Sequence, residues 1–355
     1  MKIVIDAFGG DYSPGEIIEG AVLSVKKYSD LTIILTGKLG EIDKYFTTHK
    51  LSRERIEIVD APDVIDANEA PTTAIKREGT SLGEAFNILK VDSSVDALIS
   101  CGNTGAILAG GFLKIGRIKG ISRPALAPFL PTKKGTNVLL IDCGANADCK
   151  PINLAHFAVM GSIYYSEIKG VERPKVALLS NGTEEHKGNE LVKEAYKLLE
   201  KLPINFVGNI EARDIISGDV DVVVTDGFTG NVALKSIEGA VKLAMNEIKT
   251  AIKSSAVSMF GALFLKGAFK KVKSTMDYKK YGGSPFLGTK KLIIKSHGDT
   301  KRETLCFAVD LAYDSAKLNI NSKFQEAFSK LEISEETWKR IWIELRIILL
   351  KIQSF

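Results

Sequence analysis

The sequence predicts an α/β fold with a mostly parallel, helix-covered sheet and a protruding helical arm. Short aliphatic and β-branched runs alternate with segments of helical spacing, which is typical of parallel sheets covered by helices. Five of the predicted strands end in glycine-rich or polar corners, and ligands of such sheets bind outside the carboxyl ends of the strands. A lysine-rich segment with an apolar centre, residues 249–280, interrupts the alternation and predicts the arm.

The predicted strands are short apolar runs bounded by turn residues. In chain order they span residues 2–6, 31–36, 56–60, 95–100, 137–142, 175–180, 204–208 and 220–225. Helices are predicted between them, where apolar residues recur at helical spacing. These helices span residues 14–28, 38–48, 71–78, 81–91, 103–115, 151–168, 188–201 and 229–252.

Composition indicates a water-soluble protein with a large core. The chain has 355 residues, of which 45% are hydrophobic and 26% are charged, enough to build one large domain or two lobes. No apolar run approaches the roughly 18–20 residues of a membrane span, and Met1 leads directly into a predicted strand. We therefore expect a cytoplasmic protein whose cysteines, which lack zinc or CxxC spacing, are reduced thiols. They are Cys101, Cys143, Cys149 and Cys306.

The net charge of +5 is unevenly distributed. Residues 249–280 hold eight lysines and a single acid, Asp277, so this segment carries +7 and the remainder about −2. The basic excess is therefore local, which argues against a general nucleic-acid-binding surface.

The polar corners have the chemistry of anion sites. They read DAFGGDYSP, SCGNTGA, DCGANAD, SNGTEEHKGN and TDGFTGN. Glycine permits close backbone approach to a ligand, and a helix N-terminus offers free N–H groups to an anion. Two corners repeat one pattern, V-D-three apolar-[ST]-x-G-x-T-G. We expect the corners to share one site, with Thr104 and Thr229 capping the two helices.

The corners carry no recognised cofactor motif. None reads G-x-G-x-x-G, and the nearest approach to a P-loop, GFLKIGRI, lacks the Lys-Ser/Thr pair. The histidines also lack metal-ligand spacing. We therefore predict neither a cofactor nor a metal ion.

At these corners the chain resembles the PlsX family of bacterial phosphate acyltransferases. The shared motifs are IDAFGGDYSP, SCGNTGA, GRIKGISRPALAPFLPT, DCGANADCKP, NGTEEHKGNE, EARD, DVVVTDGFTGN, and YGGSPFLG followed by KSHG. They occur in the family's order over about residues 1–320. Phe8 stands where the family usually has Met, and Cys101 and Cys143 stand where small apolar residues are usual. The segment after about Leu331 is not covered.

The resemblance implies a fold like those of isocitrate and isopropylmalate dehydrogenases and phosphotransacetylase, and a homodimer. It implies transfer of the acyl group of acyl-acyl-carrier-protein to inorganic phosphate. The acyl phosphate would pass to a membrane glycerol-3-phosphate acyltransferase for phospholipid synthesis. The acyltransferase domain is expected to span residues 1–330, with the arm, about residues 250–285, inserted into it.

This reaction needs a bound phosphate dianion, a stabilised oxyanion and a protonated leaving thiol. The two helix starts are expected to bind phosphate and the oxyanion, with Asn103, Thr104, Thr229 and Asn231 as side-chain donors. Lys187 would neutralise charge, and His297 would protonate the thiol, since histidine titrates near neutrality. Which corner binds phosphate stays open.

The expected site residues form two sets. Catalytic roles are predicted for Lys187, His297, Asn231 and Asp226. Substrate binding is predicted for polar and glycine residues of the corners: Gly9, Gly10, Asp11, Gly102, Asn103, Thr104, Gly105, Asn146, Asn181, Gly188, Asn189, Arg213, Gly227, Thr229 and Gly230.

Several alternatives accompany these roles. Lys187 is otherwise a solvated surface charge, and His297 a structural loop residue. The aspartates at strand ends, Asp6, Asp11, Asp142 and Asp226, would repel phosphate. We therefore expect them to hold backbone amides or to orient Lys187 or Arg213. A covalent route through Cys101 is disfavoured, because no histidine lies nearby in the sequence.

The arm combines lysines with the apolar run AVSMFGALFL, residues 256–265. Ten residues cannot span a bilayer, but an apolar segment with a lysine collar suits an anionic membrane surface. Membrane contacts are predicted at Met259, Phe260, Leu263 and Phe264. The lysines also suit acidic acyl-carrier protein, and a buried dimer helix is the alternative. The tail, residues 331–355, predicts an amphipathic helix that packs on the body or a dimer partner, or contacts lipid.

Three other functions compete with acyl transfer from the carrier protein. A phosphotransacetylase-like enzyme would use acyl-CoA, and the basic arm argues against it. A nicotinamide-dependent dehydrogenase of the same fold class would need adenosine-binding and metal-carboxylate features that the sequence lacks. A non-enzymatic scaffold for lipid-synthesis partners would release no carrier thiol.

Overall fold

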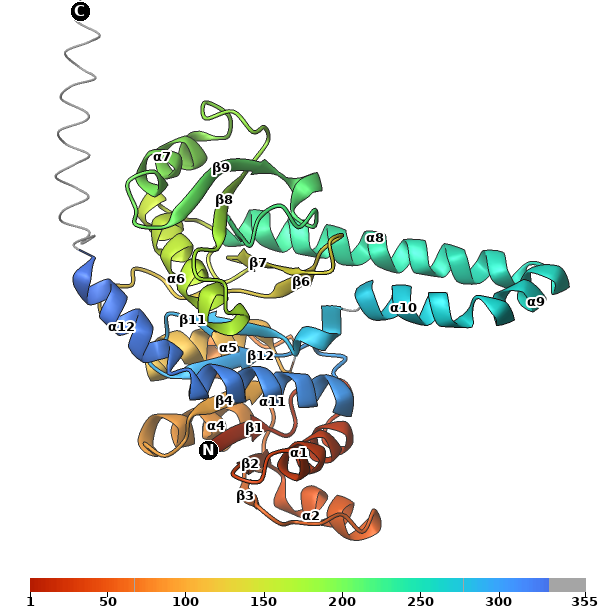
Figure 1. Ribbon diagram of the computed structural model, residues 1–355. Helices are drawn as coiled ribbons and strands as arrows, with labels where there is room; N and C mark the ends of the chain where they lie inside the picture. Colours follow the sequence, from red (N-terminus) through yellow and green to blue (C-terminus); the bar gives the residue numbers. More distant parts are fainter. Residues whose placement is uncertain (67, 277, 332–355) are drawn as a thin grey trace, which may run out of the picture.

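The computed structural model describes residues 1–66, 68–276 and 278–331. Its body contains two sheets, both covered by helices, and a long arm projects from it (Figure 1). The helix predicted over residues 331–355 therefore lies outside the described residues, apart from Leu331. No helix within the described ranges is long and apolar enough to cross a bilayer.

The first sheet has the order β3-β2-β1-β4-β12-β11-β5. Its strands are β3 (Ile56–Asp60), β2 (Thr32–Gly37), β1 (Lys2–Asp6), β4 (Ala97–Ser100), β12 (Leu292–Lys295), β11 (Ser284–Leu287) and β5 (Ala125–Leu126). Strands β3 to β12 of this order are parallel, whereas β11 runs antiparallel to both of its neighbours. We call the part of the body built on this sheet the first lobe.

The second sheet has the order β6-β7-β10-β8-β9. Its strands are β6 (Phe129–Pro131), β7 (Asn137–Ile141), β10 (Val222–Val224), β8 (Lys175–Ser180) and β9 (Asn205–Glu211). Only the edge pair β6–β7 is antiparallel within this sheet. We call the part built on it the second lobe. The chain crosses between the lobes over Ala127 and Pro128.

The predicted strands are all present, but four strands were not predicted. They are β5, β6, β11 and β12. Each has four residues or fewer, and β6 and β11 contain proline, which disfavours a strand in a sequence reading. The prediction of one sheet was also too simple, because the polar corners are shared between two sheets.

The helices mostly match the predicted ranges. They are α1 (Gly15–Lys27), α2 (Leu39–Thr48), α3 (Pro71–Ala74), α4 (Ser81–Val91), α5 (Thr104–Gly110), α6 (Pro151–Lys169), α7 (Glu190–Leu199), α8 (Gly227–Lys253), α9 (Ala256–Phe264), α10 (Lys266–Met276), α11 (Arg302–Lys317) and α12 (Ile320–Lys330). A π-helical turn, η1 (Gly111–Ile115), continues α5, and short 3-10 turns form η2 (Ala212–Asp214) and η3 (Tyr278–Tyr281). The helix predicted over 71–78 is wrong beyond Ala74, since Gly79 adopts φ +69° and a new helix starts at Ser81.

Helix α6 forms much of the core between the lobes. Phe157 and Tyr164 are completely buried on it, and it packs against β7, β8, β10, α7 and α12. A helix that is apolar on most of its circumference is typical of a buried position.

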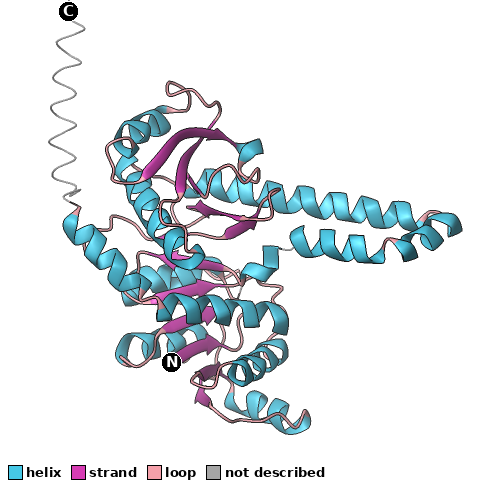
Figure 2. Cartoon of the chain, viewed as in Figure 1, coloured by secondary structure: helices cyan, strands magenta, loops and turns pink. Residues whose placement is uncertain are grey.

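Helices α8, α9 and α10 form the arm (Figures 1 and 2). The α8 helix has 27 residues, a length of about 40 Å at 1.5 Å per residue. Only Gly227, Gly230 and Leu234 are buried on α8, so the helix is anchored at its first turns and then leaves the body. At the tip, the rings of Phe260 and Phe264 pack edge to face, with centroids 5.4 Å apart.

Candidate active site

Asp142, directly after β7, organises the corner DCGANAD. Its carboxylate accepts hydrogen bonds from the backbone N–H groups of Leu126 (2.9 Å), Ala145 (3.1 Å) and Asn146 (2.8 Å). The Asn146 amide also donates to this carboxylate and to the Pro124 carbonyl, each at 2.8 Å. Asp142 therefore ties the crossover between the lobes to the corner, and Asn146 serves this structural bond instead of pointing an amide at a ligand.

The start of α8 packs directly on this corner. The Gly227 N–H donates to the Asn146 carbonyl at 2.8 Å. A Cβ added to Gly230 would lie 1.9 Å from the Asp142 carbonyl oxygen. The two glycines of DGFTGN thus let one backbone approach another. The close approach predicted for a ligand is taken here by the protein's own chain.

Asp226 caps α8, so the prediction that Thr229 is the cap was wrong. The Asp226 carboxylate accepts hydrogen bonds from the Thr229 backbone N–H at 2.8 Å and from its hydroxyl at 2.7 Å. A carboxylate in this position satisfies a free N–H of the first turn and complements the helix dipole. The Thr229 hydroxyl proton is therefore engaged, and Thr229 offers a ligand only its lone pairs.

The loop after β8 brings a third corner to the start of α8. The Asn181 side chain accepts a hydrogen bond from the Gly188 N–H at 2.8 Å, and Asn189 caps α7 by accepting from Val192 at 2.9 Å. Lys187 lies between them and is half-buried, and within the described residues its ammonium has no ion-pair partner. The loop thus carries Lys187 between Asn181 and Asn189 in the chain, with the stem of its side chain next to Gly182.

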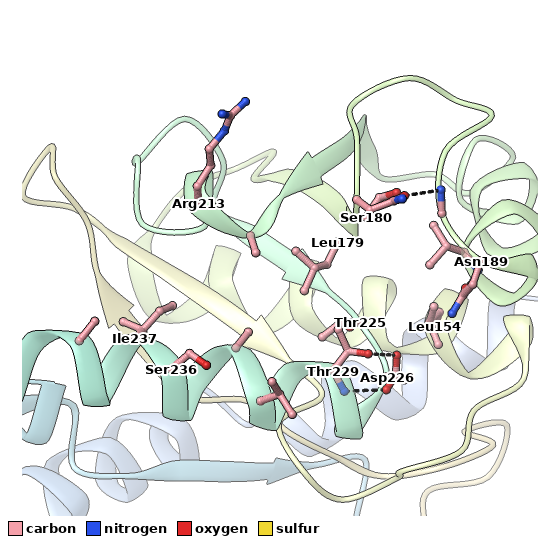
Figure 3. Close-up of a pocket in the computed structure, with 17 residues that line it drawn as sticks. Leu154, Leu179, Ser180, Asn189, Arg213, Thr225, Asp226, Thr229, Ser236 and Ile237 are labelled. Carbon is pink, nitrogen blue, oxygen red and sulfur yellow. Dashed lines mark hydrogen bonds between the residues drawn. The ribbon is translucent and has the colours of Figure 1, made fainter.

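Two pockets meet at the start of α8. The larger, about 790 Å³, lies between α8, β8 and η2 (Figure 3), and its surface is mainly apolar. The smaller, about 320 Å³, is mainly polar and lies against Ala147, Asp148 and Cys149. The pockets share Asn189, Asp226 and Thr229. A polar site and an apolar site therefore adjoin at one helix cap.

The larger pocket is also lined by Asn181, Gly188 and Arg213. The Arg213 side chain points away from its centre (Figure 3) and pairs with Glu211 at 2.5 Å and with Asp214 at 3.6 Å. Within the described part of the chain, none of Asp6, Asp11, Asp142 and Asp226 forms an ion pair with Arg213. Arg213 therefore stands at the rim of the pocket.

The first-lobe corners pack tightly against one another. Asp6 accepts a hydrogen bond from the Ser100 hydroxyl at 2.8 Å, which in turn accepts from the Gly102 N–H at 3.1 Å. A Cβ on Gly9 would lie 2.7 Å from the Gly102 nitrogen. The Asp11 N–H donates to the Gly298 carbonyl at 2.8 Å, which places the His297 loop on this corner.

Asn103 caps α5, so the prediction of a Thr104 cap was also wrong. The Asn103 side chain accepts from the Ala106 N–H at 3.0 Å, and its amide reaches the carbonyls of Asp66 and Glu69 at 3.3 and 3.4 Å. Gly105 packs on Pro71. The amide of Asn103 is therefore engaged, whereas Thr104 is exposed and, among the described residues, makes no hydrogen bond through its hydroxyl.

The predicted residues thus form two sets in two lobes. Gly9, Gly10, Asp11, Gly102, Asn103, Thr104, Gly105 and His297 belong to the first lobe. Asn146, Asn181, Lys187, Gly188, Asn189, Arg213, Asp226, Gly227, Thr229, Gly230 and Asn231 belong to the second. Of the second set, Asn181, Gly188, Asn189, Arg213, Asp226 and Thr229 line the pockets, and the convergence of both helix starts on one centre stays a prediction.

Burial keeps the cysteine thiols protonated. It raises the pKa of Cys101 and of Cys149 to about 12, and it raises the pKa of Cys143 well above the usual range. A nucleophilic cysteine needs the thiolate form, so these thiols argue against a covalent thioester intermediate.

Burial also raises the pKa of the Asp142 carboxyl to about 6, opposed by its hydrogen bonds from Asn146, Leu126 and Ala145. Because the unfolded value is about 3.9, the stability from this group is fully present below about pH 4. It is lost as the pH rises through about 6. We expect the difference in the free energy of unfolding between the protein and Asp142→Asn to grow by about 1 kcal/mol from pH 7 to pH 5.

Urea unfolding at pH 5, 6 and 7 measures this difference. Asp148→Asn is the matched control, since it makes the same substitution at an exposed aspartate of the same corner and leaves the buried carboxyl in place. An Asp142→Asn difference that is constant with pH would show that the buried carboxyl does not titrate in this range.

Sequence analysis missed the apolar lining of the larger pocket. Val232, Ala233, Ile237 and Ala240 supply it from α8. Their spacing is that of one helix face, so a helical projection of residues 229–241 would have found them.

A family model described as "Fatty acid synthesis protein" matches residues 1–323. A phosphate acyltransferase from Clostridium novyi is 46% identical over 326 residues, covering 92% of this chain and 98% of that protein. One from Clostridium tetani is 43% identical over 333 residues, covering 94% and 99% respectively.

A solved structure shares the fold. A phosphotransacetylase from Streptococcus pyogenes aligns with a TM-score of 0.61 at 18% identity, covering 90% of this chain and 94% of that one. The predicted helix-covered, mostly parallel α/β fold is therefore confirmed, with its strands divided between two sheets.

Proposed function

The chain belongs to the family of fatty acid synthesis proteins that includes the phosphate acyltransferases, and it is an acyltransferase that uses phosphate as acceptor; we propose that its donor is long-chain acyl-acyl-carrier-protein. The products are then acyl phosphate and free carrier protein, for use in phospholipid synthesis. The observation that carries this proposal is the junction of a polar pocket and a large apolar pocket at Asn189, Asp226 and Thr229. An anionic acceptor and an acyl chain would meet there.

The proposed mechanism is direct attack. A phosphate oxygen attacks the thioester carbonyl carbon, the carbon–sulfur bond breaks, and the departing sulfur takes a proton. Lys187, half-buried and without an ion-pair partner among the described residues, would offset the negative charge. Asn231 lies beside Gly144 and would donate to the oxyanion.

The remaining roles are assigned by position. Asp226, although proposed as catalytic, acts through Thr229 and the first turn of α8, so we propose it as a positioning residue. Asn181, Gly188, Asn189, Arg213 and Thr229, which line the two pockets, would surround the substrate. The first-lobe set, with His297 as acid, completes the site only if the lobes converge.

The test is phosphate-dependent release of carrier thiol from C16 acyl-carrier protein, with acyl phosphate trapped by hydroxylamine. Purified full-length protein should release thiol and form the hydroxamate only when phosphate is present. Absence of both products would overturn the proposal. Parallel reactions with C16 acyl-CoA test the alternative donor.

The arm is the proposed surface for partners. Its tip exposes Val257, Phe260 and Phe264, with 82%, 65% and 78% of their surfaces accessible, next to exposed Lys253 and Lys266. Met259 is also exposed, whereas the side chain of Leu263 lies outside what the structure describes. This combination suits an anionic membrane surface or acidic acyl-carrier protein.

We propose a cytoplasmic homodimer that binds the inner membrane surface peripherally and delivers acyl phosphate to a glycerol-3-phosphate acyltransferase. In this arrangement residues 1–330 form the enzyme domain, the arm is its membrane-facing insertion, and residues 331–355 add an amphipathic helix.

Replacing Met259, Phe260 and Phe264 together by serine should lower binding to anionic vesicles at least 10-fold, because each exposed aromatic ring contributes about 1.5–3 kcal/mol when buried. Co-sedimentation with phosphatidylglycerol vesicles measures it. Val91→Ser, which removes an exposed apolar side chain on the body, is the control. Unchanged vesicle binding by the triple variant would rule out the arm tip as the membrane contact.

A further inference from the structure

A second apolar pocket continues the first along α8. It has a volume of about 550 Å³, and Leu130, Pro131, Ile216 and Val241 supply much of its mainly apolar surface. The two pockets share Ile237 and Arg213. Since Arg213 points outward (Figure 3), Ile237 is the side chain that stands between them.

The residues that link the pockets lie on one face of α8. Ala233, Ile237, Ala240 and Val241 follow the spacing i, i+4, i+7 and i+8, which places them on a single helix stripe. That stripe begins one turn beyond Thr229, where the polar pocket meets the larger apolar pocket. The apolar surface therefore leads from the polar site along the helix.

The length of this surface fits a long acyl chain. Thr229 and Val241 are twelve residues apart, about 18 Å along the helix axis. The hydrocarbon core of a bilayer is about 30 Å thick and two acyl chains deep, so one long chain reaches about 15 Å. The larger pocket borders α8 residues between Thr229 and Ala240, and the second borders Ile237, Glu238 and Val241 on the side of β6.

We propose that the two pockets form one acyl-chain channel and that Ile237 and Ile216 determine which chain lengths it accepts. The inference rests on the proposed function. The thioester carbon lies at the Asp226–Thr229 end, short chains stay within the first pocket, and long chains pass Ile237 into the second.

Charged side chains also line the second pocket. Lys133, Asp214 and Glu238 line the second pocket, and Glu238 forms an ion pair with Lys235 at 2.7 Å. A methyl end that reached these charges would displace their water without replacing its hydrogen bonds. The charges therefore set an upper limit on chain length, and Ile237 sets the entry to the second pocket.

The test places a larger side chain at the middle of the proposed channel. Ile237→Trp should lower kcat/KM for C16 acyl-carrier protein at least 10-fold relative to C8, because each CH2 kept out of an apolar site costs about fourfold. Gly239→Trp is the matched control. It places the same ring two residues away on α8, where an added Cβ meets nothing within 4 Å, and it should leave the C16/C8 ratio unchanged.

A second variant that also fills the channel controls for misfolding of the first. Ile216→Trp enters the channel from the loop after η2 and should lower the same ratio by a similar factor, with the melting temperature as a check on folding. An unchanged ratio in both variants, with C8 transfer intact, would overturn the channel while leaving the proposed function standing. Loss of transfer for every chain length in the unmodified protein would instead overturn the proposed function.

The alternative occupant of this surface is a second copy of the chain. Light scattering on each variant distinguishes a subunit interface from an acyl-chain channel. A change of oligomeric state with an unchanged C16/C8 ratio would assign the surface to a subunit interface and overturn the channel. A lower ratio with unchanged oligomeric state supports it.

Discussion

Gly230→Ala is expected to lower acyl transfer at least 100-fold. An added Cβ would lie 1.9 Å from the Asp142 carbonyl oxygen and 2.9 Å from Thr225 Cγ2. The nearer of these atoms belongs to the backbone, in a corner held by the four hydrogen bonds of the Asp142 carboxylate. The start of α8 must therefore move by about 1 Å or more, and a displacement of that size at a reacting centre costs about 100-fold.

The same clash should lower the free energy of unfolding by about 1–3 kcal/mol, the usual cost of overpacking. Gly239→Ala is the matched control on the same helix, because its new methyl group meets nothing within 4 Å. Alanine there should stabilise α8 by up to about 1 kcal/mol and leave activity unchanged. Steady-state kinetics and urea unfolding of both variants measure the effects. Full activity in Gly230→Ala would contradict the packing of α8 on the Asp142 corner.

The polar corners show how far sequence reasoning reaches. Their positions at strand ends follow from composition and periodicity alone, and the structure places Asp6, Asp142 and Asp226 there. Their partners do not follow from the sequence. A glycine that admits a ligand and a glycine that admits a neighbouring backbone look the same in a motif, and only the contact of Gly230 with Asp142 distinguishes them.

The helix caps were misassigned for a related reason. The repeated pattern ends in T-G, and threonine is a common cap, yet Asn103 and Asp226 cap α5 and α8 instead. Each cap residue has a side-chain oxygen that reaches the N–H three positions further on. The capping distance could have been applied to the sequence, because Asn103 and Asp226 both stand three residues before a free N–H.

The division of the strands into two sheets could not be predicted from local sequence patterns. Strands β5 and β6 are the bordering strands on the two sides of the crossover, and they hold two and three residues. Strands this short gain their stability from pairing. Strand β5 pairs with β11, which is distant in the chain, and β6 pairs with β7, which closely follows it. Long-range pairing leaves little trace in the sequence of such a strand.

Lys187→Met is expected to lower kcat/KM about 100-fold, which is the scale on which single oxyanion-stabilising groups act. The residue is half-buried, and its backbone is fixed on both sides. Its N–H donates to the Glu184 carbonyl at 3.0 Å, and the following Gly188 donates to Asn181 at 2.8 Å. These bonds fix the backbone of Lys187 beside Gly188 and Asn181, which line the larger pocket, so less entropy is lost than for a lysine on a free loop.

The loss should appear partly as a higher KM for phosphate, since methionine keeps the length of the side chain and removes its charge. Lys187→Arg should recover part of the activity, because it restores the charge with a different donor geometry. Lys193→Met is the matched control, since Lys193 is an exposed lysine of α7 six residues away and should matter little. Equal kinetics for Lys187→Met and Lys193→Met would return Lys187 to the status of a solvated surface charge. The oxyanion would then depend on Asn231.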